Sequence, residues 1–385
     1  MDEVGRFLVE LGLLFLLLGV LGALARRIGL SPVPLFLLGG LLLGEGGLAD
    51  IEATAPFVEA TAEIGVLLLL LLLGLEFSAS EFTSSLKHHA PSGLVDLALN
   101  ATPGFLAGLL FDFAWPACLA LAGITWISSS GIVARLLHDL RRVGNRETPA
   151  VLSVLVLEDM AMALYLPVLA VVLAGGTAGR AAVGALLAVG VVLAVLIAAH
   201  RFGDQLARAL RHDDDEQVVL RVLGLTLLVA GLTHWVGASA AVGAFLVGLA
   251  IPGETARRAR EVLSPLRDLF AAIFFLAFGL RVAPAEVAPA LPAALALAAV
   301  TTATKVLTGW YAARRDGVGA RGRVRAGTAL VARGEFSVVI AGLAVLAGYE
   351  QIGPLASAYV LLLAITGPVL ARVADNIPLA GSRDG

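Results

Sequence analysis

Charged residues are scarce in this 385-residue chain: Asp, Glu, Lys and Arg together make up only 15% of it, whereas hydrophobic residues make up 59%. Soluble proteins keep about a quarter of their residues charged. This scarcity, with a mean hydropathy of +0.92, excludes an ordinary soluble domain and indicates an integral membrane protein. The net charge of -3 argues neither for nor against a nucleic-acid partner, and we expect none.

Groups that bind metals or act as nucleophiles are also missing. The single cysteine, Cys118, excludes an intrachain disulfide and a thiolate cluster. The six histidines lack the i, i+4 spacing of helical metal sites. The sequence contains neither a Gly-x-Ser-x-Gly elbow nor a phosphate-binding loop. We therefore expect no enzyme activity and no cofactor.

Long apolar runs dominate what is present. A bilayer core about 30 Å thick needs about 20 apolar residues per helix. Thirteen such spans are predicted, with centres near residues 14, 37, 68, 101, 125, 161, 189, 226, 244, 272, 300, 335 and 363. The fold class is therefore an all-α, multi-pass membrane protein of the cell membrane, embedded in the lipid bilayer.

The distribution of basic residues among the loops supports the number of thirteen spans. Loops after odd-numbered spans and the C-terminus hold 22 of the 27 basic residues, and the other side holds only Arg6, Arg180 and Arg281. Cytoplasmic loops attract positive charge, which places the N-terminus outside and the C-terminus inside. Only Lys305 and Arg333 remain, and both lie within apolar spans.

The two halves of the chain echo each other at an offset of about 205 residues. "FLLGGLLLG" (36–44) resembles "VGAFLVGLA" (242–250), Gly74 corresponds to Gly279, and "SSSG" (128–131) aligns with "RGEF" (333–336). An odd number of spans separates each pair, so the second copy is expected to be inverted in the membrane. Inverted repeats are typical of secondary transporters whose site lies between broken helices near the midplane.

Two adjacent acids, Glu158 and Asp159, lie in the middle of an apolar span. A charge at the bilayer centre is costly, so each acid should face a cavity or a partner. Neighbouring helical residues point about 100° apart, so the two cannot face the same spot. A structural ion pair is one interpretation. The other is a site that exchanges a proton for a cation, because desolvation makes the charged carboxylate harder to maintain.

Interrupted helices are expected on both sides of the repeat. Thr125 and Ser128, Ser129 and Ser130 form a poor continuous helix, and their oxygens suit alkali cations, although serines also mediate helix packing. The inverted counterpart carries Arg333, Gly334 and Glu335, read as an intramembrane ion pair beside a glycine. Charged residues at such breaks would neutralise the half-helix dipoles.

Lys305 needs an anion at its depth, and Glu158 or Asp159 is expected to supply it. The alternative is that Lys305 reaches the inner interface. Asp96 and Asn100 are secondary candidates for the same site.

In this order, "GLSPVPLFLLGGLLLG", "EIGVLLLLLLLGLEF", "SSSGIVARLL", "VLEDMAMA", "GAFLVGLAI", "FFLAFGLRV" and "ARGEFSVVIAG" resemble the membrane domain of bacterial monovalent cation:proton antiporters. The nearest branch is that of the glutathione-gated potassium efflux systems. The resemblance spans nearly the whole chain.

The resemblance implies a thirteen-helix homodimer whose core, including about 56–174 and 264–373 within a transmembrane domain of 1–375, moves past a dimerisation domain. It also implies that Asp159 binds the ion and the proton and that the spans near 125 and 335 cross. Glu158 departs from the Asp, Asn or Gln of the known branches. A Glu158–Lys305 pair would resemble the electrogenic members, and Asp159 acting alone the electroneutral ones.

The expected function is exchange of K⁺, or alternatively Na⁺, for H⁺ by alternating access. A sodium-coupled symporter of an organic anion and a ligand-gated cation efflux channel remain alternatives. The tail at 376–385 leaves no room for the cytoplasmic nucleotide-binding domain usual in potassium efflux relatives. A separate soluble regulatory subunit on the arginine-rich inner face is therefore expected.

Overall fold

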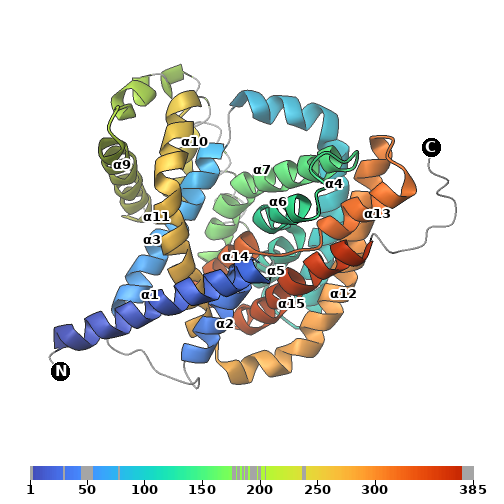
Figure 1. Cartoon of the computed structure of the whole chain (residues 1–385), viewed down its shortest axis with the longest axis horizontal. Coiled ribbons are helices and arrows are strands. Elements are labelled where there is room, and N and C mark those ends of the chain that lie inside the picture. The colour runs from blue at the N-terminus through green and yellow to red at the C-terminus, as the bar shows by residue number, and fades with distance from the viewer. Residues whose placement is uncertain are drawn as a thin grey trace. The chain divides into compact units, whose positions relative to one another are not determined.

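The computed structural model is all-helical over the residues that it describes. These are 3–28, 31–44, 55–76, 79–175, 201–203, 205–235 and 240–374, together with residues 179, 183, 186, 190 and 197. Twelve of the thirteen predicted span centres fall within described helices, and the centre near 189 lies outside the described residues, as does the predicted tail at 376–385. Figure 1 shows the helices along the chain.

Within the described residues, nine helical stretches are long and apolar enough to cross a membrane, and three apolar helices are shorter. The helices are α1 (Glu3–Arg27), α2 (Val33–Leu43), α3 (Ala55–Glu76), α4 (Ala79–Leu110), α5 (Trp115–Trp126), α6 (Ser130–Asp139), α7 (Thr148–Leu173), α9 (Asp215–Trp235), α10 (Ala240–Ala250), α11 (Gly253–Leu280), α12 (Pro284–Arg315), α13 (Ala320–Ala329), α14 (Glu335–Leu346) and α15 (Ile352–Val373).

The helices of the two halves correspond in length and spacing. α4 and α12 have 32 residues each and begin 205 positions apart, and α2 and α10 have 11 residues each. The interrupted pair α5 and α6 corresponds to the pair α13 and α14. The glycine pattern in the sequence therefore marks a repeat of whole helices.

Equivalent glycines make equivalent contacts in the two copies. A Cβ added to Gly40 of α2 would lie 2.9 Å from the Gly279 Cα of α11, and one added to Gly248 of α10 would lie 2.9 Å from the Gly74 Cα of α3. Each pair lets two helix backbones touch, and any side chain larger than hydrogen would separate them. The short helices α2 and α10 are thus anchored in the same way.

The chain divides into two compact units, and each is described by itself. The first contains residues 1–54, 88–158 and 275–385, and the second contains residues 55–87 and 159–274. The boundary passes through α7 between Glu158 and Asp159. The two units are defined by contacts between residues and do not show which helices move together. The mobile core expected at 56–174 and 264–373 therefore stays a prediction.

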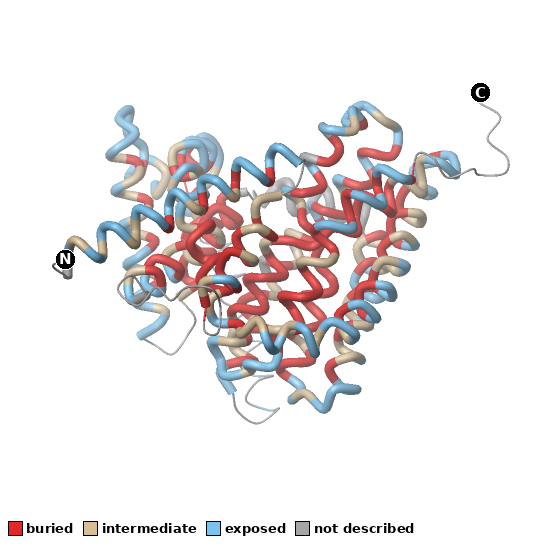
Figure 2. Tube along the Cα trace, turned by 60° about the horizontal axis from the view of Figure 1, so that its bottom comes forward, coloured by how far each residue is buried: buried red, intermediate tan, exposed pale blue. Residues whose placement is uncertain are grey.

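Burial differs sharply among the helices. In the first unit, all but two residues of α5 are buried, and α14 is nearly as enclosed. By contrast, α1 has mostly exposed apolar side chains. The tube that starts at the N label in Figure 2 is accordingly coloured mainly pale blue. In the second unit, α10 packs on α3 and α9 around a core that includes Leu68, Leu71 and Val222. The polar site described next lies in the first unit.

Candidate functional site

Both predicted helix interruptions are present. α5 ends at Trp126, Ile127 is extended with ψ 128°, and α6 begins at Ser130. α13 ends at Ala329, and α14 begins at Glu335 after a non-helical stretch. The two unwound segments meet, because the Ser129 N–H donates to the Ala332 carbonyl at 2.9 Å. Helix breaks expose backbone groups that need partners in a membrane, and here each break supplies partners to the other.

Gly334 allows this close approach. A Cβ added to Gly334 would lie 2.4 Å from the Ser129 Oγ, well inside contact distance. Ser129 in turn caps α6, since its Oγ accepts from the Ile132 N–H at 3.2 Å and donates to Glu335 Oε2 at 2.8 Å. A hydroxyl before the first turn is a usual cap for a helix N-terminus.

Arg333 does not form the predicted ion pair with Glu335. Its Nη2 donates to the Thr125 carbonyl at 2.8 Å, and its Nη1 donates to the carbonyls of Leu330 and Val331 at 3.1 and 3.0 Å. The side chain is fully buried. A guanidinium has five donors in a fixed fork, so it can serve the carbonyl ends of α5 and α13 together, which a single carboxylate partner would not require.

Charge at the four half-helix ends follows the helix dipole. The cation Arg333 lies at the two C-terminal ends, where the dipole is negative, and the carboxylate of Glu335 lies in the first turn of α14. Glu158 also accepts from the Ser128 N–H at 2.6 Å, just before α6. These placements stabilise the ends of short helices. The predicted neutralisation is therefore present with a different set of partners.

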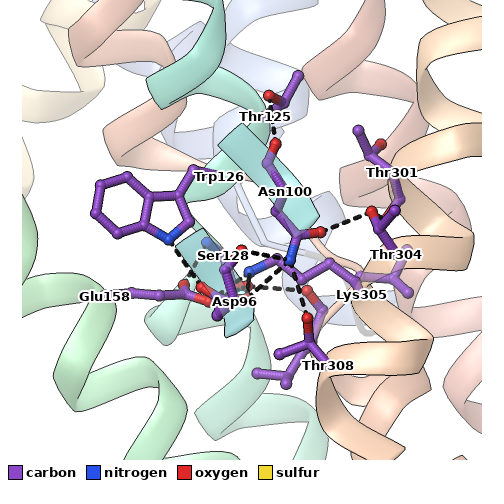
Figure 3. A network of polar contacts seen from close by, with 12 residues as sticks. Asp96, Asn100, Thr125, Trp126, Ser128, Glu158, Thr301, Thr304, Lys305 and Thr308 are labelled. Carbon is purple, nitrogen blue, oxygen red and sulfur yellow. Dashed lines mark hydrogen bonds and ion pairs between the residues drawn. The ribbon is translucent and has the colours of Figure 1, made fainter. Parts of the chain in front are cut away.

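Lys305 is fully buried and has two carboxylate partners, as Figure 3 shows. Its Nζ lies 2.5 Å from Glu158 Oε1 and 2.6 Å from Asp96 Oδ1. The pairing with Glu158 answers which of the two adjacent acids Lys305 binds, and the alternative in which Lys305 reaches the interface is excluded. Asp96, a secondary candidate in the sequence, belongs to the centre of this cluster.

Glu158 is held on both oxygens. Besides Lys305 and the Ser128 N–H, it accepts from the Ser128 Oγ at 3.1 Å, and this hydroxyl also lies 3.0 Å from the Leu330 carbonyl. Glu158 therefore ties α7 to Ser128 of the first break, and the Ser128 hydroxyl in turn lies beside Leu330 of the second break. Asp159, the next residue of α7, is partly exposed, and its direction differs from that of Glu158 by about 100°.

A second layer of polar side chains surrounds Asp96. Trp126 Nε1 donates to Asp96 Oδ2 at 2.8 Å, and Asn100 Nδ2 donates to Asp96 Oδ1 at 2.9 Å (Figure 3). Asn100 also accepts from the Thr304 hydroxyl and donates to the Thr308 hydroxyl. The repeat aligns Asn100 with Lys305 in the sequence, but Trp126, Thr304 and Thr308 are not evident as site residues from the sequence. For Thr304 and Thr308 the sequence signal is the i, i+4 spacing of their hydroxyls along α12, and Trp126 has no such signal.

The predicted site residues divide into two groups. Thr125, Ser128, Ser129, Glu158, Lys305, Arg333 and Glu335 converge on the two helix breaks. The Thr125 side chain contacts α4, because its hydroxyl donates to the Asn100 backbone carbonyl at 2.8 Å. The second group consists of Ser130, which begins α6, and Asp159 of α7, and both are only partly buried. The described residues contain no group of three or more His, Cys, Asp or Glu side chains suited to a metal ion.

Two interrupted helices that meet beside buried charges, in an all-helical membrane chain built from a repeat, define a secondary transporter. The sequence model described as "Sodium/hydrogen exchanger, transmembrane" matches residues 13–374. The chain therefore belongs to this family of monovalent cation/proton antiporters, and it is a multi-pass membrane transporter and not an enzyme.

Individual relatives agree with this assignment. The chain is 32% identical over 378 residues to the Bacillus subtilis "K(+)/H(+) antiporter subunit KhtU", with 96% of this chain and 93% of that protein covered. It is 30% identical over 382 residues to the "Ammonium/H(+) antiporter subunit AmhT" of Alkalihalophilus pseudofirmus, covering 96% and 94%. The sodium proton antiporter MjNhaP1 of Methanocaldococcus jannaschii matches in fold, with a TM-score of 0.71, 17% identity and 97% of each chain covered.

Proposed function

We propose that this chain exchanges a monovalent cation, K⁺ in preference to Na⁺, for H⁺ across the cell membrane by alternating access. The observation that carries the proposal is the buried Lys305 held by two carboxylates where the two interrupted helices meet. Such a cluster fixes charge deep in the protein while leaving the adjacent acid, Asp159, partly exposed. In this proposal Asp159 binds the cation and the proton in turn, and the transported ions take the place of a cofactor.

The two helix breaks carry oxygen groups of a kind that suits an alkali cation. Hydroxyls and carbonyls near the breaks, from Thr125, Ser128 and Ser129, are hard ligands of the kind these ions prefer. The relatives named for K⁺ and for ammonium support a large monovalent ion over Na⁺. A relative from Enterococcus hirae is named for Na⁺, so the selectivity experiment includes all three ions.

Fluorescence dequenching in everted vesicles tests the proposal. K⁺, Na⁺ and NH₄⁺ are added in turn to vesicles with wild type, Asp159→Asn, and Asp316→Asn as a matched control at an exposed position. We expect K⁺-driven proton movement in wild type and the control and none in Asp159→Asn. Equal K⁺-driven proton movement in wild type and both variants would overturn the role of Asp159, and K⁺ flux without proton movement would indicate a channel.

The assembly is part of the same proposal. We infer thirteen spans with the N-terminus outside and the C-terminus inside, a homodimer, and a separate soluble regulatory subunit. The names of both relatives contain the word "subunit", which supports an additional chain. The basic residues from the last turn of α12 to the end of α13, which include Arg314, Arg315 and Arg321, supply a charged inner face for it. Affinity purification from the native membrane that repeatedly recovers no soluble partner would contradict this part.

A further inference from the structure

Lys305 is paired with two carboxylates, although one would balance its charge. Its Nζ contacts Asp96 and Glu158 at nearly equal distances, and all three side chains are at most 1% exposed. With all three groups ionised, the cluster carries one net negative charge. One carboxylate would be enough to pair the ammonium group, so the second requires a separate explanation.

The two carboxylates are held in different ways. Among the described residues, Asp96 accepts only from side chains of α4, α5 and α12, which are Asn100, Trp126 and Lys305. Glu158 receives its other donors from Ser128 at the first helix break, and it precedes Asp159 in α7. Asp96 is thus bound by side chains that lie within helices, including Trp126 at the end of α5, whereas Glu158 is also bound by Ser128 in the first unwound segment.

The remaining charged groups of the breaks are already engaged. Arg333 donates to backbone carbonyls of both breaks, and Glu335 accepts from Ser129. Among the described residues, the titratable groups at Lys305 are therefore Asp96 from α4 and Glu158 from α7, with Asp159 adjacent to Glu158 along the helix.

We infer that Asp96 is a positioning residue that retains Lys305 when Glu158 releases it, so that an incoming cation does not have to displace the ammonium group from its only counter-ion. This inference rests on the proposed antiport and assigns one step of it. With Asp96 present, the ammonium group stays paired at 2.6 Å while Glu158 becomes available beside Asp159. Without Asp96, release of Glu158 as the cation arrives at Asp159 would leave Lys305 with no counter-ion among the described residues.

The test compares initial dequenching rates at varied K⁺ for wild type, Asp96→Asn, Lys305→Gln and the double variant. We expect Asp96→Asn to raise the apparent KM for K⁺ about tenfold or more, the size of one lost charge-assisted contact, with a smaller change in maximal rate. Because Asp96 acts through Lys305, adding Asp96→Asn to Lys305→Gln should leave KM unchanged. Trp126→Phe, which keeps the carboxylate, should raise KM much less than Asp96→Asn.

Two outcomes would overturn the inference. One is an unchanged KM in Asp96→Asn, and another is the same rise in KM whether or not Lys305 is present, which would mark Asp96 as merely structural. If Asp96→Asn does not fold, Lys305→Gln and the double variant still decide, because unequal KM values between these two would contradict the coupling. A wild-type chain without cation-driven proton movement would instead refute the proposed function itself.

Discussion

Lys305 illustrates how this protein keeps charge inside a membrane. Desolvation of an ammonium group and two carboxylates is expensive, and only short contacts and additional hydrogen bonds offset it. Each partner here has them: Asp96 accepts from Trp126 and Asn100, and Glu158 accepts from Ser128. Loss of one charged side chain of the cluster should therefore destabilise the folded protein far more than replacement of all three.

Replacing Lys305 with alanine should destabilise the protein strongly. The variant leaves Asp96 and Glu158 buried together without a cation, and breaking a buried pair costs about 3–5 kcal/mol. The midpoint of thermal unfolding in detergent should fall well below that of wild type. Arg315→Ala, at an exposed position, serves as the control and should not change it. Neutral Asp96→Asn and Glu158→Gln changes added to Lys305→Ala should restore part of the loss; no restoration would contradict the electrostatic account.

Arg333 should not tolerate lysine. A lysine keeps the charge but lacks the planar fork that reaches the Thr125 carbonyl and the carbonyls of Leu330 and Val331 together. We expect Arg333→Lys to lower the free energy of unfolding by at least about 2 kcal/mol, measured by denaturation in detergent. Arg372→Lys at an exposed position is the matched control. An Arg333→Lys protein as stable as this control would show that these carbonyls find other donors.

At this scale the sequence predicts types of residue better than partners. A pairing of Lys305 with Glu158 or Asp159 could be foreseen, because few other acids lie at that depth, but the choice of Glu158 could not. Asp96 as a second partner, and Arg333 bound to carbonyls instead of Glu335, could not. Those contacts depend on the rotation of α4 and on the path of the unwound segments, and neither leaves a mark in local spacing.

The interrupted helices form a single structural element made from both repeats. α14 packs on α5 and α15, and the first break shares hydrogen bonds with the second. Neither break could satisfy its backbone groups alone, so the two form together or not at all. The serine–glycine composition predicts that the helices stop, and the dipole argument predicts the sign of charge at each end. The hydrogen-bond partners themselves come only from three-dimensional packing.

Replacement of the glycines at equivalent positions of α4 and α12 should destabilise the protein. A Cβ added to Gly309 of α12 would lie 2.4 Å from the Gly327 Cα of α13, and one on its repeat counterpart Gly104 would lie 2.3 Å from the Leu121 carbonyl oxygen. Overpacking of this kind costs about 1–3 kcal/mol.

Gly309→Ala and Gly104→Ala should therefore unfold at lower temperature than wild type, whereas Gly144→Ala, with no atom within 4 Å of the added Cβ, should not. Thermal unfolding in detergent measures all three. If Gly309→Ala matched Gly144→Ala, the close contact between α12 and α13 would not be essential.

Over the whole molecule, the repeat is the feature that the sequence predicts most completely. The 205-residue offset read from glycines corresponds to the offset between the starts of α4 and α12. Hydropathy alone is less complete, because α2, α10 and α14 are shorter than a full crossing. Division into two compact units leaves no trace in composition, since it follows contacts between segments far apart in the chain.

Cysteine labelling can test the predicted orientation. In a Cys118→Ala background, Asp316→Cys lies before α13 and Glu350→Cys lies after α14, both at exposed positions. If the interrupted helix crosses the membrane with the C-terminus inside, a membrane-impermeant maleimide added to intact cells should label only Glu350→Cys. Asp316→Cys should react only after the cells are permeabilised. Labelling of both from the same side would refute the thirteen-span topology.

The order of synthesis adds a consequence of the Lys305 cluster. Asp96 and Lys305 are separated by 209 positions, and a ribosome adds about 5–20 residues per second. Asp96, and later Glu158, therefore enter the bilayer before their cation exists, Asp96 by about 10–40 s. During that interval an acid at the centre of a helix costs about 2.5–3.5 kcal/mol, so the nascent helices α4 and α7 are incompletely anchored. The emergence of α12 supplies the missing positive charge. Insertion of this late helix is therefore the step that fixes α4 and α7 in their final positions.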